Sequence, residues 1–553
     1  MTPWWRGAAL VAATFTVLLC ATMASAAPAR IAVVYDGGES TGAGEVLRAA
    51  RALGASVEVT VYAAGDGGQT LDDDAETTLT HQDVVFVDGG SDQAQAHRAL
   101  LTRVGAATRL AVTSPAPGLA GTVTGEQAAR LAEYWRQPSQ ENYRGLLTYL
   151  ARVVVAGAPA STVAAPRHYP EDGFYRPGAD ALFDDWAAYR ETRDADADAL
   201  PRIGILFHRN LYLQEDLATV DALIEAVRAE GGEPVALAYD DDPRLDRLQD
   251  DRGLPRVDAV IFQGTVLDRD HREAGIDRAR ALGVPVLSAL QVRGRDGAAY
   301  RQSDHGLAPR DSGNVARGER DGTFEPLAVA AAGQRRFGRR DAEPMAEQVR
   351  WRAARAVSWA RLQRRANADK RVVFTFWSES GGKADLGADP DDFLDVPGTL
   401  IQLLKQMKAR GYDLGQAPLP DRDQLSQRLV EEAANIGGWA GQSLRRRAAG
   451  DDVIKVPLAR YQQWFDGLPA SLRERMIDVW GPPPGHIQVG DPDGDPFVML
   501  PALRFGKVVI AAHPAWGYLE NEKALKSADA LPPITSTRRS FCGCRRSSRR
   551  TPG

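Results

Sequence analysis

Short apolar runs rich in β-branched residues occur at three places along the chain. They lie at residues 30–36 (RIAVVYD), 201–210 (PRIGILFHRN) and 371–378 (RVVFTFWS), and their starts are about 170 residues apart. A continuous apolar run of this length is typical of a strand that is buried on both faces of a parallel sheet. The pattern therefore predicts three parallel-sheet modules in succession.

A helical pattern that ends in glycine follows each of these runs. The segments are ARALGASVEVTVY, VRAEGGEPVALAY and MKARGYDLG, and further strands are predicted at residues 83–88, 257–263 and 507–513. A helix that is closed by glycine between two strands is the βαβ crossover of a parallel sheet. We therefore predict an α/β, multi-domain protein built from successive doubly wound parallel-sheet modules of the flavodoxin or Rossmann type.

Changes in composition predict the domain boundaries. The expected parts are a first α/β module at 27–160, a connection at 161–200, a second α/β module at 201–342, and a helix followed by an incomplete third α/β module at 343–533. Glycine, arginine and aspartate alternate over residues 300–342, which predicts a long loop. Residues 343–366 predict one helix with a solvated cationic face.

The first 26 residues have the pattern of a secretory signal peptide. Arg6 precedes an apolar run from Ala8 to Ala21, and Ala24-Ser25-Ala26 stands before Ala27. The run is shorter than a comfortable membrane span, so cleavage before Ala27 is expected. We therefore expect an exported, periplasmic protein with no membrane span after cleavage. An uncleaved signal that anchors the chain is the alternative.

Residues 534–553 differ from the rest of the chain. They hold six arginines, two of the three cysteines and no acidic residue, whereas the whole chain has a formal net charge of −6. This abrupt change predicts an aberrant basic tail on a truncated chain, for which a frameshift is the simplest explanation. A genuine basic tail that recruits an anionic surface is the alternative.

Composition and missing motifs exclude several classes of function. An isoelectric point near 5.9 argues against nucleic acid as a partner. Residues 27–533 contain no cysteine, which excludes disulfides, thiolate metal sites and a cysteine nucleophile from this region. The chain has no GxxxxGK[ST], HExxH or GxSxG motif, so we expect no ATP site and find little support for a hydrolase.

The segment WSESGGKADLG after the third apolar run combines a flat ring, both signs of charge and glycines. Trp377 is placed to stack on an aromatic ligand, and Lys383, with Glu379 nearby, is placed to pair with a ligand carboxylate. An ordinary βα turn with Trp377 packed under a helix explains the same residues.

Two histidines stand at predicted strand ends. His208 ends the first strand of the second module, where open α/β sheets present ligand-binding residues, and His513 ends the strand predicted at residues 507–513. This position suits a metal or macrocycle ligand. A histidine that is satisfied by neighbouring backbone groups is the alternative.

Residues 367–415 resemble the large subunit of cobaltochelatase and the related H subunit of magnesium chelatase. Lys383 and Gly387 fit the family pattern there, whereas Trp377-Ser378 replaces its Tyr-Pro turn. Glu141-Asn142 resembles the family's Glu-Asn-Leu region, and the segment around Tyr175 resembles its Tyr-His-Pro segment, with Arg176 where histidine is expected. The resemblance covers most of residues 130–533, which correspond to the N-terminal portion of the family.

This resemblance implies a tetrapyrrole ligand, a divalent metal (cobalt, magnesium or iron) and separate AAA-type subunits that hydrolyse ATP. It also adds Glu141 and Asn142 to the candidate ligand-binding residues, beside His208, and His513 remains the candidate metal ligand from its position at a strand end. The family's His-Gly-Thr-x-Glu motif does not occur in the chain. Export would separate the chain from AAA-type partners and from cytoplasmic ATP.

The leading interpretation is an exported, truncated family member that binds a tetrapyrrole for metal insertion or exchange. The alternatives are a non-catalytic periplasmic binding protein for a tetrapyrrole or another small ligand, and a nonfunctional frameshifted product.

Overall fold

The structure is a computed structural model. It describes residues 27–513 except 37–42, 64–67, 73, 114–117, 194–198, 269–270, 304–305, 337–338, 377–394, 435–440, 451–452, 485–488 and 491–495. The expected signal peptide and the basic tail therefore lie outside the described residues. The chain divides into two compact units, unit 1 (Met1–Arg361) and unit 2 (Leu362–Gly553). In the described parts of both units, no helix is long and apolar enough to cross a bilayer.

The first sheet of unit 1 has four parallel strands in the order β2-β1-β3-β4. They are β1 (Ala29–Val34), β2 (Val57–Tyr62), β3 (Val84–Val87) and β4 (Arg109–Val112). Side chains on β1 alternate between two cores, with Ile31 and Val33 in one and Ala32 and Val34 in the other. Burial on both faces explains why this strand has a continuous apolar sequence.

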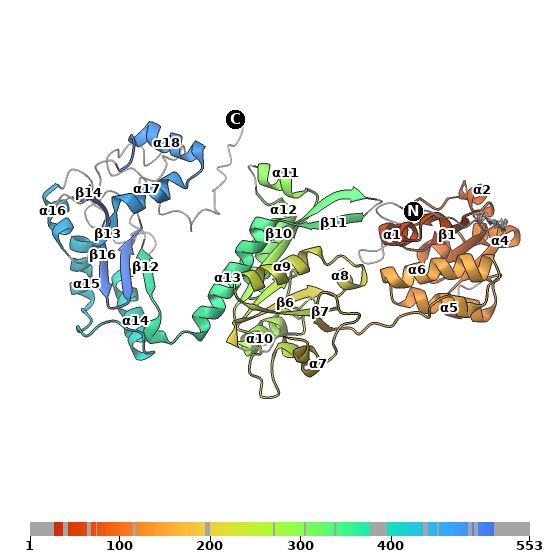
Figure 1. Ribbon diagram of the computed structural model, residues 1–553, viewed down its shortest axis with the longest axis horizontal. Helices are drawn as coiled ribbons and strands as arrows, with labels where there is room; N and C mark the ends of the chain where they lie inside the picture. The colour runs from red at the N-terminus through yellow and green to blue at the C-terminus, as the bar shows by residue number, and fades with distance from the viewer. Residues whose placement is uncertain are drawn as a thin grey trace, which may run out of the picture. The chain divides into compact units, whose positions relative to one another are not determined.

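Helices cover both faces of this first sheet (Figure 1). They are α1 (Ala43–Ala52), α2 (Ala75–Thr80), α3 (Asp92–Ala96), α4 (Arg98–Ala107), α5 (Gly125–Arg136) and α6 (Gln140–Tyr149), and α6 continues into the π-helical turn η2 (Leu150–Val155). α1, α5 and α6 pack on the face that carries Ile31 and Val33. α2 and α4 pack on the opposite face. The first sheet is thus the centre of a three-layer α/β arrangement.

Unit 1 also contains a seven-stranded sheet in the order β11-β10-β9-β8-β6-β7-β5. Its strands are β5 (Gly173–Tyr175), β6 (Arg202–His208), β7 (Glu233–Tyr239), β8 (Ala259–Gln263), β9 (Val286–Val292), β10 (Phe324–Arg336) and β11 (Arg339–Pro344). The central strands from β10 to β7 are parallel, and the edge strands β5 and β11 pair antiparallel. The predicted connection between modules thus contributes an edge strand, β5.

Helices also pack on both faces of the seven-stranded sheet. Those of this region are α7 (Trp186–Glu191), α8 (Asn210–Leu213), α9 (Ala218–Ala229), α10 (Arg272–Leu282), α11 (Gly297–Gln302), α12 (Pro309–Arg320) and α13 (Ala346–Arg364). α9 and α13 bury their apolar sides in one core, and α7 and α10 contribute to the core on the other face. Short 3-10 helices in unit 1 are η1 (Gly54–Ser56), η3 (Ala160–Thr162) and η5 (Leu245–Leu248).

The described part of unit 2 contains two three-stranded sheets. In the first, β12 (Val372–Phe376) is parallel to β17 (Val508–Ala512), which pairs antiparallel with β16 (Ala502–Phe505). The second is antiparallel and contains β13 (Ile454–Pro457), β15 (Phe497–Leu500) and β14 (Val489–Gly490). The helices are η6 (Asn367–Asp369), α14 (Val396–Ala409), α15 (Arg422–Arg428), η7 (Leu429–Ala433), α16 (Gly441–Ala449), α17 (Leu458–Asp466) and α18 (Ala470–Trp480). α14 and α15 pack on the first sheet.

The predicted fold class is confirmed, since the structure is α/β with parallel sheets and the three apolar runs form β1, β6 and β12. The prediction of a long loop over residues 300–342 is wrong. This stretch forms α12, β10 and most of β11. α12 is mostly charged and polar, and the buried run of β10 is rich in alanine, which has a weak strand preference. Neither element therefore had a recognisable periodicity.

The predicted helix over residues 343–366 forms α13, but one of its cations is buried. The Arg352 side chain is fully buried and donates a hydrogen bond to the Glu325 carbonyl oxygen. Arg355 and Trp359 also donate to the Glu325 carboxylate. Burial lowers the pKa of Arg352 to about 10. α13 thus presents part of its positive charge to the protein interior, where Glu325 compensates for it.

Candidate functional site

The first sheet of unit 2 places His513 at the end of a parallel strand pair. β12 and β17 run in register from the Val372–Val508 pair to the Phe376–Ala512 pair. The backbone N–H of His513 donates to the Phe376 carbonyl oxygen at 2.8 Å, and the histidine is half-buried. The carboxyl ends of both strands therefore lie at one edge of the sheet, which we call the β12–β17 edge.

The predicted ligand-binding segment follows this edge in the sequence. Phe376 immediately precedes Trp377, but Trp377, Glu379 and Lys383 lie outside the described residues. Their role therefore stays a prediction. Below the edge, Phe376 packs with Ile510 and Leu404 in an apolar core, so the strand ends are anchored. Ligands of open α/β sheets bind outside the carboxyl ends of the strands. The β12–β17 edge is therefore the candidate site in unit 2.

His208 ends β6, a central strand of the seven-stranded sheet in unit 1. Its Nδ1 accepts a hydrogen bond from the backbone N–H of Asn210 at 3.1 Å. Its ring meets Tyr239 edge to face, with 5.7 Å between the ring centroids. These contacts orient the half-buried ring and match the alternative of a histidine held by its own turn. A ligand-binding role for His208 stays a prediction.

The Asn142 side chain forms hydrogen bonds that fix the segment around Arg167, which leads from the first sheet of unit 1 to the second. This side chain is buried in α6, and its Nδ2 donates to the carbonyl oxygens of Gln137 at 3.0 Å and Arg167 at 2.9 Å. Its Oδ1 accepts from the backbone N–H of Arg167 at 2.9 Å. One amide group thus satisfies three backbone groups in two segments, as buried polar groups require. This geometry is that of a structural clamp.

Glu141, the neighbour of Asn142, points to the surface of the same junction. It accepts from the Arg167 guanidinium at 2.9 Å and from the Tyr169 hydroxyl at 2.9 Å. Partial burial opposes ionisation of Glu141, but these two hydrogen bonds outweigh it and hold its pKa below the usual value. The Tyr169 ring also contacts Tyr212 on α8, at 6.0 Å between centroids. Glu141 is thereby connected to the helix that follows His208.

A second set of contacts joins the two sheets of unit 1 beside this clamp. Gln140 donates to Gln214 Oε1 at 3.0 Å, and both side chains are almost fully buried. Arg144 forms an ion pair with Glu215 at 2.6 Å, and Glu215 has a left-handed backbone with φ of 54°. The three consecutive residues 140–142 therefore all contribute to one junction, and Glu141 is the most exposed of them.

The metal-binding prediction rests on His513 alone. Across the ranges that the structure describes, no group of three or more His, Cys, Asp or Glu side chains is arranged to hold a metal ion. A metal-binding role for His513 therefore stays a prediction. Its imidazole is a nitrogen donor of the kind that transition metals accept.

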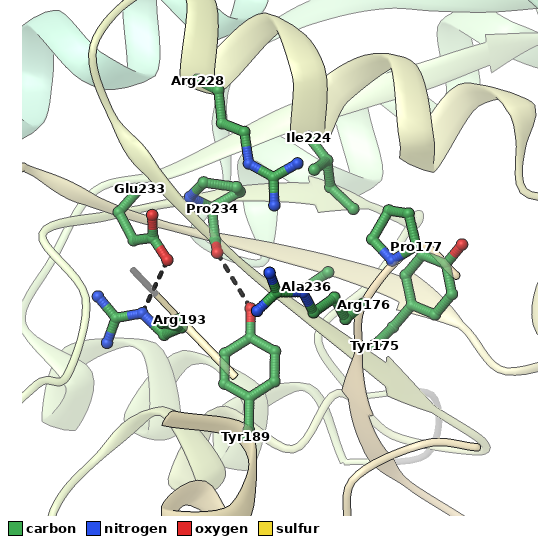
Figure 2. Close-up of a pocket in the computed structure, with 10 residues that line it drawn as sticks. All are labelled: Tyr175, Arg176, Pro177, Tyr189, Arg193, Ile224, Arg228, Glu233, Pro234 and Ala236. Atoms are coloured by element: carbon green, nitrogen blue, oxygen red, sulfur yellow. Dashed lines mark hydrogen bonds and ion pairs between the residues drawn. The ribbon is translucent and has the colours of Figure 1, made fainter. Parts of the chain in front are cut away.

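Sequence reasoning missed a small polar cavity in unit 1 (Figure 2). It has a volume of about 10 Å³, which is roughly the room for one water-sized group. It is lined by residues of β7 and α9 and by residues at the ends of β5 and α7, including Arg176, Arg193 and Arg228. The sequence contained one signal for this cavity, Arg176, which occupies a position where the family segment has histidine.

Asn142→Ala tests the structural role of the clamp. The change leaves three backbone groups without their partner, so we expect the free energy of unfolding to fall by about 3 kcal/mol in urea titrations. Amide exchange at Arg167 should also accelerate. Asn314→Ala on α12 is the control and should change stability by about 0.5 kcal/mol or less. If the Asn142→Ala variant has the same free energy of unfolding as the wild type, the structural role proposed for Asn142 is wrong.

Comparisons with known proteins identify the family of this chain. The CobN/Magnesium Chelatase family model matches residues 132–535. The aerobic cobaltochelatase subunit CobN of a Sinorhizobium species is 27% identical over 76% of this chain and 33% of its own length. The rice chloroplastic magnesium-chelatase subunit ChlH is 25% identical over 70% of this chain and 28% of its own length. The catalytic subunit of cobaltochelatase from Mycobacterium tuberculosis shares the fold, with a TM-score of 0.66 and 24% identity over 91% of this chain and 40% of that one. The chain spans about a third of the length of these curated relatives, and it belongs to the CobN/magnesium chelatase family.

Proposed function

We propose that this chain binds a tetrapyrrole at the β12–β17 edge of unit 2. The observation that carries the proposal is the family match over residues 132–535, since the relatives are named as subunits of cobaltochelatase and magnesium chelatase, whose substrates are tetrapyrroles. The geometry adds support because the β12–β17 edge combines His513 with the strand end that precedes Trp377.

Each proposed ligand-binding residue suits a different part of a tetrapyrrole. The Trp377 indole offers a flat apolar surface for the macrocycle. The Lys383 ammonium pairs with a peripheral carboxylate, and Glu379 limits the net charge of the segment. His513 supplies a nitrogen ligand to the substrate metal, which is cobalt, magnesium or iron. In this proposal the chain holds and orients the ligand.

Absorption titrations of the purified full chain test this proposal. We expect the Soret bands of haem and protoporphyrin and the visible bands of a corrinoid to shift as protein is added. Trp377→Ala should weaken binding of all three ligands about tenfold or more, because it removes the stacking surface. His513→Ala should weaken only the metal-containing ligands, and the exposed His81→Ala is the control. If no ligand binds, or if His513→Ala binds haem as wild type does, the proposal is wrong.

We also propose that the chain is exported, on the basis of the signal-peptide pattern in residues 1–26. Cell fractionation should find the protein in the periplasm, and its N-terminal sequence should begin at Ala27. A cytoplasmic protein that retains residues 1–26 would refute export. Because an exported chain is separated from cytoplasmic ATP, the proposal does not include ATP-driven metal insertion.

A further inference from the structure

The cavity beside β5 and β7 is lined by arginines, and two of them have no ion-pair partner among the residues that the structure describes. Arg193 pairs with Glu233 through an Nε–Oε1 contact of 2.7 Å, and both side chains are largely buried. Arg176 and Arg228 also line the cavity, and among the described residues neither has an ion pair or a side-chain hydrogen bond. Among the lining residues that the structure describes there are thus three guanidinium groups and one carboxylate.

The guanidinium groups of Arg176 and Arg228 are directed at the same place (Figure 2). Figure 2 shows Arg176 and Arg228 extending toward the Tyr189 hydroxyl, with the Arg193–Glu233 pair beside it. The Tyr189 hydroxyl donates to the Pro234 carbonyl oxygen at 3.1 Å, which fixes its direction. Burial, with a smaller effect from Glu233, raises the pKa of Tyr189 to about 12 despite the nearby arginines. The phenol therefore stays neutral and does not balance their charge.

The segments that carry these arginines have fixed positions. Arg176 directly follows β5, and the Tyr175 hydroxyl donates to Asp221 on α9 at 2.9 Å. Gly173 allows β5 to approach its neighbours, because a Cβ there would lie 2.8 Å from Leu182. Arg228 lies in the last turn of α9, where the helix dipole supplies only a partial negative charge. The two guanidinium groups are thus presented by a strand end and a helix that are tied together.

We propose that this cavity binds a dianionic phosphate group, either as free phosphate or as the end of a small phosphate monoester. The guanidinium groups of Arg176 and Arg228 match the charge of a phosphate dianion, and their planar N–H forks match its oxygens. The cavity has room for about one water-sized group, so one phosphate oxygen enters it while the rest faces solvent near the exposed Arg228. This site lies in unit 1 and does not depend on the proposed tetrapyrrole site.

Isothermal titration of the full chain with inorganic phosphate, at constant ionic strength in chloride, tests the proposal. We expect saturable binding that weakens about tenfold in Arg228→Ala and about a hundredfold or more in Arg176→Ala/Arg228→Ala. Arg280→Ala removes the same charge from an exposed site on α10 and should bind phosphate as wild type does. Because Arg228 is exposed, its single variant is expected to fold, and circular dichroism checks each variant.

Titrations with two further anions identify the chemical class of the ligand. Glycerol 3-phosphate should bind at least as tightly as inorganic phosphate if the source is a monoester, and more weakly if it is free phosphate. Acetate, a monoanion, should bind about tenfold more weakly than phosphate. The proposal is overturned if the wild-type chain shows no saturable phosphate binding, if the folded double variant retains wild-type affinity, or if acetate binds as tightly as phosphate.

Discussion

Parallel strand pairing is the constraint on which the arrangement of candidate residues depends. In a parallel pair the carboxyl ends of both strands must lie at the same edge of the sheet, so residues far apart in sequence meet there. β12 and β17 show this directly, because their register brings Phe376 and His513 together across more than a hundred residues. His208 has the corresponding position on β6 in unit 1. The two histidines thus share a structural position, although they belong to different compact units.

The junction within unit 1 depends on buried hydrogen bonds instead. Asn142 and Gln140 are buried polar side chains, and each has its partners in a segment remote in sequence. Buried amides of this kind are costly unless they are satisfied, so they specify one arrangement of the connecting segment. This explains in physical terms why Gln140 and Asn142 stand at the beginning of α6. Glu141, which lies between them, is exposed and accepts from Arg167 and Tyr169, and its role as a ligand-binding residue stays a prediction.

The sequence predicted those elements whose burial leaves a clear pattern. β1, β6 and β12 were recognisable because strands of parallel sheets are apolar throughout, and α13 because its length and periodicity are those of a helix. α12 and β10 were missed because charged helices and alanine-rich strands carry weak patterns. The hydrogen bonds between Asn142 and Arg167 depend on tertiary structure, and so does the position of Arg176 and Arg228 around one cavity, which periodicity does not encode. The Trp377 segment lies outside the described residues, so its predicted role rests on sequence alone.

The central claim is that a tetrapyrrole binds at the β12–β17 edge. Hydrogen–deuterium exchange of the full chain, with and without saturating haem, locates the ligand without any substitution. The account predicts added protection in residues 372–376 and 508–513, with no change in the seven-stranded sheet of unit 1. Haem binding that leaves both of these segments unprotected would contradict the account.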